Sequence, residues 1–63
     1  MTADQYKIII MRLGLSQEKA GLWLGLSERQ GQRYASGDQA IPEPVAKLLR
    51  LMIKLKLKPD DVD

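Results

Sequence analysis

Residues 16–37 read SQEKAGLWLGLSERQGQRYASG and contain two short helix patterns joined by a glycine turn. Ser16 and Ser27 each precede a run of helix-forming residues and fit N-caps, whose side-chain oxygens accept hydrogen bonds from early backbone N–H groups. Gly25 and Gly37 stand where a left-handed residue commonly closes a helix. This stretch therefore predicts one helix over 17–24 and a second over 27–36.

The segment before this stretch predicts another helix. Thr2 followed by Gln5 fits a capping box, in which each residue satisfies a backbone N–H of the other. Apolar residues then recur at helical spacing until Gly14, which is suited to closing the helix. The predicted helix covers residues 3–13.

The segment after the stretch predicts the last helix, over 43–57. Pro42 and Pro44 sit where a first helical turn tolerates a missing N–H, and Pro59 ends the pattern. The core-facing stripe is expected to consist of Val45, Leu48, Leu49, Met52 and Leu55. The alternating segment 54–58, KLKLK, is also compatible with a terminal strand, although Lys and Leu are good helix formers.

Length and composition fix the class of the molecule and exclude several functions. Sixty-three residues make one small domain spanning 1–63, which we expect to be an all-α, four-helix bundle, with a short fifth C-terminal turn as a variant. Cysteine and histidine are absent, so disulfides, thiolate metal sites and the commonest general base are all missing. We therefore expect no enzyme activity, no metal, no cofactor and no small-molecule ligand.

The location of the protein is also predicted from composition. The lack of cysteine and of a secretory pattern at Met1 favours a cytoplasmic protein. The longest apolar run, residues 8–11, is far shorter than the roughly 18 residues of a membrane span, so no membrane association is expected.

The predicted helix over 27–36 is unusually polar. Every residue from Glu28 to Arg33 is polar or glycine, and only Tyr34 and Ala35 are suited to packing inward. Such a face meets either solvent or a polar ligand, and the pattern by itself leaves both interpretations open.

The stretch from Ser16 to Gly37 resembles the helix-turn-helix of the phage-repressor and Cro type, also called the xenobiotic-response-element family. The residues that carry the resemblance are Gln17, Gly21, Gly25, Ser27 and Tyr34. The family usually has valine or isoleucine where this chain has Gly31, so we expect a lost packing contact and about 1 kcal/mol of lost helix propensity there. The resemblance implies a Cro/repressor-like bundle with its motif at 17–36 and sequence-specific binding to double-stranded DNA.

The resemblance also implies which residues meet DNA, because the second helix of the motif enters the major groove. The predicted base contacts are Glu28, Arg29, Gln32 and Arg33. The predicted phosphate contacts are Gln17, Ser27, Gln30, Ser36 and Lys47. The alternatives are that the arginines form surface ion pairs with Glu28 or Asp38, that Ser27 is only an N-cap, and that Gln30 and Lys47 face solvent.

Surplus apolar residues late in the chain predict a partner. Segment 43–58 carries a net charge of +4 and more apolar residues than one core needs, and Leu51, Ile53, Leu57 and Val62 are expected to form a homodimer seam. Their alternative is to pack beneath the chain's own tail. The leading functional hypothesis is a dimeric repressor, of the kind found in phages and mobile elements, that reads a near-palindromic operator and represses its own operon. The alternative is an antitoxin or adaptor that binds a partner protein through the 43–57 helix.

Overall fold

The computed structural model describes residues 1–61, which form four α-helices and one 3-10 turn. The helices are α1 (Ala3–Arg12), α2 (Gln17–Trp23), α3 (Glu28–Ser36) and α4 (Glu43–Lys54), and the turn is η1 (Pro59–Asp61). The all-α, four-helix class is therefore confirmed, with η1 as the short fifth element. Within these residues there is no strand, so the strand alternative for 54–58 is wrong. No helix among them has the length and apolar character that crossing a bilayer requires.

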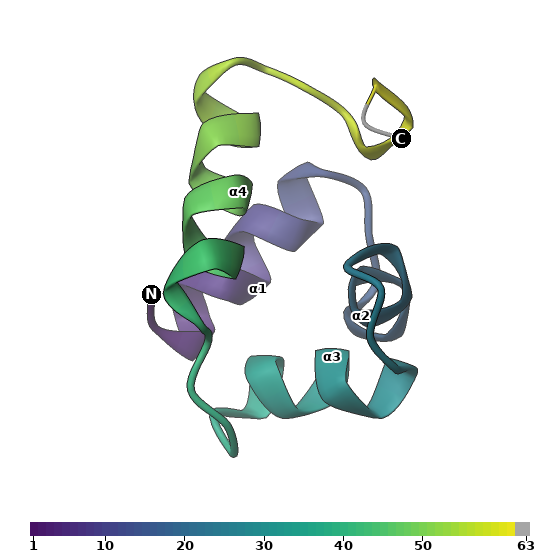
Figure 1. Ribbon diagram of the computed structural model, residues 1–63, viewed down its shortest axis with the longest axis vertical. Coiled ribbons are helices and arrows are strands. Elements are labelled where there is room, and N and C mark those ends of the chain that lie inside the picture. The colour runs from purple at the N-terminus through teal and green to yellow at the C-terminus, as the bar shows by residue number, and fades with distance from the viewer. Residues whose placement is uncertain (62–63) are drawn as a thin grey trace.

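The helices enclose the core from different directions (Figure 1). In this view α2 is seen almost end-on, α3 lies across the bottom, and the chain after α4 returns towards α2. The indole Nε1 of Trp23 donates to the carbonyl oxygen of Pro59 at 3.3 Å and so fastens that returning segment to α2.

The predicted N-caps are confirmed. Thr2 and Gln5 form the complete capping box, with backbone-to-side-chain distances of 2.9 and 3.1 Å. Ser16 accepts from the backbone N–H of Lys19 at 3.1 Å, and Ser27 accepts from that of Gln30 at 3.0 Å. These side chains satisfy N–H groups that have no partner inside their helices, and they fix where three of the four helices begin.

Helix α4 ends three residues earlier than predicted. Lys56 adopts the left-handed conformation with φ of 56°, and the next residue, Leu57, donates its backbone N–H to the carbonyl of Met52 at 2.8 Å. Lys56 itself donates to the carbonyl of Ile53 at 3.2 Å, which completes a Schellman motif. The turn places Leu57 against the core, although no glycine marks the helix end in the sequence.

The core is built mainly by side chains of α1, α3 and α4, to which α2 adds Ala20. Tyr6 and Tyr34 pack edge to face, with ring centroids 5.8 Å apart, and Leu49 and Met52 are buried beside them. In the predicted α4 stripe, Leu49 and Met52 are confirmed as buried, but the prediction was wrong for two residues. Leu48 and Leu55 are 36% and 56% exposed, because the buried side of α4 instead follows Ala46, Leu49 and Met52.

The backbones of α2 and α3 approach each other closely at a pair of glycines. A Cβ atom built on Gly31 would lie 2.7 Å from the backbone nitrogen of Gly21 and would also clash with the carbonyl oxygen of Gln17. A Cβ atom on Gly21 would lie 2.8 Å from the nitrogen of Gly31. The expectation that Gly31 loses a packing contact is therefore wrong, since the missing side chain is what lets the two backbones touch.

Candidate nucleic-acid interface

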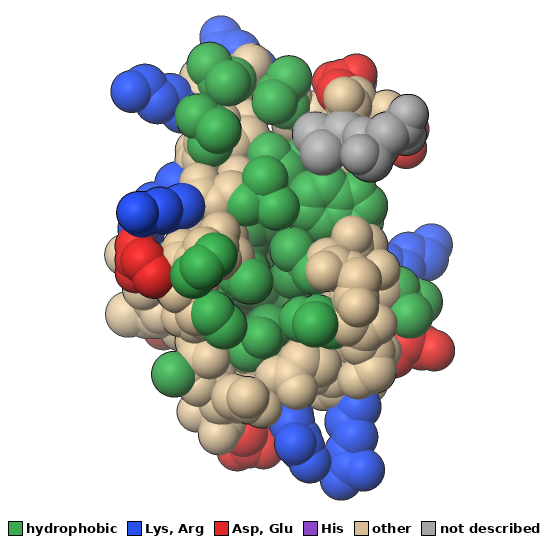
Figure 2. Space-filling model, in the orientation of Figure 1, with side chains coloured by type: hydrophobic (Ala, Val, Ile, Leu, Met, Phe, Trp, Pro, Cys, Tyr) green, Lys and Arg blue, Asp and Glu red, His purple; other side chains and the backbone are tan. Residues whose placement is uncertain are grey.

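Helix α3 is held to the body by one side only. Tyr34 and Ala35 are buried, as predicted, and so is Gly31, whereas Arg29 and Arg33 are exposed. In the space-filling view, long Lys and Arg side chains project from the lower edge of the molecule, beneath α3 (Figure 2). The polar side of α3 is therefore free to meet a ligand.

Most of the predicted DNA contacts lie around one shallow hollow. Its volume is about 360 Å³, and its lining comes from the start of α2, the outer side of α3 and the turn after α3. The lining residues are Gln17, Arg29, Gln32, Arg33, Ser36 and Asp38. The fold thus brings three predicted base contacts together with two predicted phosphate contacts. One of these, Gln17, precedes the other four in the chain by 12 to 19 residues.

Both arginines of the hollow keep their guanidinium groups unpaired. Among residues 1–61 the ion pairs are Lys7–Asp4 at 3.4 Å and Arg50–Glu43 at 3.3 Å. Neither Arg29 nor Arg33 pairs with Glu28 or Asp38. The alternative in which these arginines form surface ion pairs is therefore wrong. Each guanidinium retains donors that match guanine O6 and N7 or phosphate oxygens.

Gln32 reaches back to α2. Its Nε2 donates to Oε1 of Glu18 at 2.9 Å, which links the two helices of the motif at the edge of the hollow. The hydrogen bond from Gln32 is the main reason that the pKa of Glu18 lies below its usual value, because it stabilises the charged carboxylate. The sequence prediction did not include Glu18 in the site, since no periodicity relates residues on different helices.

The two predicted serine contacts have local structural roles. Ser27 Oγ caps α3, as its alternative interpretation stated. Ser36 Oγ donates to the carbonyl of Arg33 at 3.1 Å and accepts from the N–H of Asp38 at 3.3 Å, so it shapes the turn beneath the hollow.

Three other predicted contacts lie outside the lining of the hollow. Glu28 is exposed in the first turn of α3, and Lys47 is exposed on α4. Gln30 is half-buried and donates its amide to Oε1 of Gln39 at 2.9 Å, so it fastens the loop after α3 rather than facing solvent freely. The structure therefore does not gather these three residues with the arginines.

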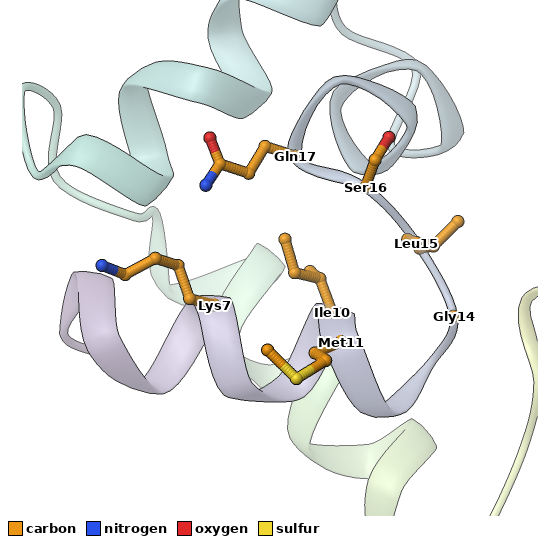
Figure 3. A pocket seen from close by; sticks show the side chains of 7 residues that line it. All are labelled: Lys7, Ile10, Met11, Gly14, Leu15, Ser16 and Gln17. Atoms are coloured by element: carbon orange, nitrogen blue, oxygen red, sulfur yellow. The ribbon is translucent and has the colours of Figure 1, made fainter.

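A cation that the sequence prediction missed lies on the other side of Gln17. A second hollow of about 430 Å³ lies between α1 and the start of α2 and is lined mostly by apolar groups, including Ile10, Met11 and Leu15. Lys7 and Gln17 lie at the same end of this hollow (Figure 3). Because Gln17 lines both hollows, Lys7 extends the polar surface of α3 onto α1.

The predicted dimer seam is only partly available. Leu51 is 50% exposed, but Ile53 and Leu57 are partly buried against the protein's own core. Val62 lies outside the described residues. The exposed apolar stripe of α4 consists instead of Leu48, Leu51 and Leu55, and apolar side chains gather at the upper end of α4 in Figure 2.

The remaining chemistry of the described residues is sparse. Residues 1–61 contain no group of three acidic side chains placed to hold a metal ion. No protein-family model, curated protein or solved structure matches the chain. The function must therefore be inferred from the geometry of the α2–α3 surface.

Proposed function

We propose that the protein binds double-stranded DNA in a sequence-specific way and acts as a transcriptional regulator, with α3 in the major groove. The observation that carries the proposal is the pair of unpaired guanidinium groups, Arg29 and Arg33, projecting one turn apart from a helix whose other side is fixed to the body. An arginine placed in this way bridges guanine O6 and N7, a contact that discriminates against the wrong base by about 1–3 kcal/mol.

The charges around the arginines favour binding to DNA through base contacts over binding through general attraction to the phosphate backbone. Asp38 lines the hollow, Glu18 is hydrogen bonded to Gln32 of the lining, and Glu28 lies on the exposed first turn of α3. These carboxylates offset the arginine charges, and Asp4 pairs with Lys7 at 3.4 Å. The phosphate contribution therefore rests on the amide of Gln17 and on a Lys7 whose charge is partly offset. Binding is therefore expected to depend on direct contacts with base edges and to be weak on non-cognate duplexes.

A second copy of the chain would complete the site. One recognition helix buries roughly 600–1,000 Å² of protein surface, which is at the low end for specific binding. Two copies related by a two-fold axis would read half-sites about 34 Å apart. We place the seam on the exposed stripe Leu48, Leu51 and Leu55, and site occupancy by such a dimer would repress transcription.

A second candidate function rests on the same stripe. Lys47, Arg50 and Lys54 flank it, and like charges repel across a symmetric contact. A partner protein with an acidic, apolar segment would also match this surface. In that case the protein is an antitoxin-like or adaptor module that binds its partner through α4.

The DNA proposal is tested by selection from a library of random duplexes followed by anisotropy titration of the enriched sequence. We expect the wild type to enrich a defined motif and the variant Arg29→Ala/Arg33→Ala to lose it. The matched control is Arg12→Ala/Arg50→Ala, which removes the same number of guanidinium groups from a hollow between α1 and α4. Equal loss in both variants, or no enrichment by the wild type, would contradict the proposal.

The oligomeric state separates the two candidate functions. Sedimentation equilibrium of the wild type is expected to show a dimer that Leu51→Asp converts to a monomer, with a matching loss of affinity for the two-half-site duplex. A wild type that stays monomeric in the presence of that duplex would favour the partner-protein function.

A further inference from the structure

The hydrogen bond between Gln32 and Glu18 decides which way the glutamine amide faces. At neutral pH the Glu18 carboxylate is ionised, as an ordinary glutamate is, and the bond from Gln32 lowers its pKa further. An ionised carboxylate only accepts hydrogen bonds, so it requires the NH₂ side of the Gln32 amide and excludes the carbonyl side. The 2.9 Å distance from Nε2 to Oε1 has this orientation.

The fixed amide leaves a defined pair of groups for a ligand. Within residues 1–61 Gln32 makes no other side-chain hydrogen bond, so its Oε1 and its second N–H stay unpaired at the hollow. One acceptor beside one donor is the complement of adenine, which offers the N6 amino group and the N7 acceptor in the major groove. Guanine offers two acceptors there and does not match.

We infer that Glu18 is a positioning residue that makes Gln32 select adenine. This inference rests on the proposed DNA-binding function and extends it, since it assigns the base that one residue reads and the residue on another helix that sets the choice. Glu18 acts through Gln32 and has no base contact of its own.

Reversing the charge of residue 18 is expected to change the base that Gln32 prefers from adenine to guanine. A lysine at this position donates hydrogen bonds only, so it would bind the carbonyl oxygen of Gln32 and turn both amide N–H donors outward. Two donors match the O6 and N7 acceptors of guanine. Glu18→Gln, a neutral partner that accepts or donates, would allow both orientations and weaken the discrimination.

The experiment measures base preference at each position of the selected duplex for the wild type, Glu18→Gln and Glu18→Lys, each with and without Gln32→Ala. We expect the wild type to prefer adenine at one position by about fivefold or more, Glu18→Gln to reduce this preference and Glu18→Lys to shift it to guanine. All three proteins should lose discrimination at that position alone once Gln32 is alanine. Asp60→Lys, which makes the same charge change on η1, controls for the general gain in affinity and should leave the preference unchanged.

Two results would overturn the inference, and they differ from failure of the proposed function. If the wild type selects a motif but Glu18→Lys leaves every position unchanged, Glu18 does not set the reading of Gln32. If the Glu18 effect persists in the Gln32→Ala background, the carboxylate acts directly. If the wild type selects no motif at all, the proposed function fails and the inference fails with it.

Discussion

The contact between α2 and α3 and the core between α1, α3 and α4 are held together in opposite ways. Gly21 and Gly31 bring two backbones together with no side chain between them. The core instead depends on large side chains, including Tyr6, Tyr34 and Leu49. A Cβ atom added at either glycine would clash with backbone, whereas a side chain shortened in the core would leave a cavity. The orientation of α3, and with it the direction of its arginines, is therefore set mainly by the glycine contact.

The largest effect is expected from Gly31→Ala. Its methyl group would clash with the carbonyl oxygen of Gln17 and with the backbone of Gly21, and backbone atoms cannot rotate away. Overpacking typically costs about 1–3 kcal/mol, and a clash with rigid backbone lies at or above that range. A chain of this length has only about 3–9 kcal/mol of total stability. We monitor thermal unfolding by circular dichroism. We expect the cooperative transition to disappear or its midpoint temperature to fall strongly.

The matched control for that variant is Gly25→Ala. A Cβ atom at Gly25 meets nothing within 4 Å, so only its left-handed φ of 81° opposes the substitution, at about 1 kcal/mol. If the two variants lose equal stability, the close approach of α2 and α3 is not what Gly31 provides.

The side-chain core is tested by Leu49→Ala, which is expected to destabilise by about 2–5 kcal/mol because it leaves a cavity beside Met52 and the tyrosines. Leu49 is 1% exposed, whereas Leu22 is 55% exposed on α2. Leu22→Ala should therefore change the free energy of unfolding by less than about 0.5 kcal/mol. Urea titration measures both values, and similar losses would contradict the assigned core.

A gain in stability is expected from Lys56→Gly. Lys56 has a positive φ at the end of α4, and glycine adopts that conformation without the steric cost of a side chain, which is about 1 kcal/mol. Lys54→Gly, inside the last turn of the same helix, should instead lose about 1 kcal/mol. Thermal melts of the two variants should shift in opposite directions, and a shared direction would contradict the Schellman motif at this helix end.

The smallest effect is expected from the hydrogen bond between Gln32 and Glu18, which joins α3 to α2. Because the folded-state pKa of Glu18 is below its usual value, the bond to Gln32 contributes stability above the unfolded-state pKa and loses it as the pH falls through the folded-state pKa. Carboxyl ¹³C titration by NMR should show the Glu18 midpoint rising in Gln32→Ala. An unchanged midpoint would mean that the hydrogen bond does not form in solution.

Local signals in the sequence predicted most of the fold. The three N-caps and the glycine ends of α1, α2 and α3 depend on residues within one turn of each other, so reading along the chain was sufficient to find them. The end of α4 was missed because Lys56 adopts a conformation for which lysine gives no signal.

The site was predicted in part, for a related reason. The resemblance to the helix-turn-helix family implied Arg29, Gln32 and Arg33 as base contacts, and the structure gathers them with Gln17. The roles of Gly31 and Glu18 were missed because each depends on a residue of the neighbouring helix. Gly31 of α3 meets Gly21 of α2, and Glu18 of α2 meets Gln32 of α3, at separations of 10 and 14 residues that no helical period connects.

The most direct test of the central claim is a ¹H–¹⁵N NMR titration of the protein with the duplex that it selects. We expect the signals of Gln17, Arg29, Gln32 and Arg33 to shift together and the signals of the Arg12 and Arg50 side chains to stay unchanged. Shifts confined to the exposed face of α4, or none with any duplex, would contradict the assignment of α3 as a DNA-reading helix.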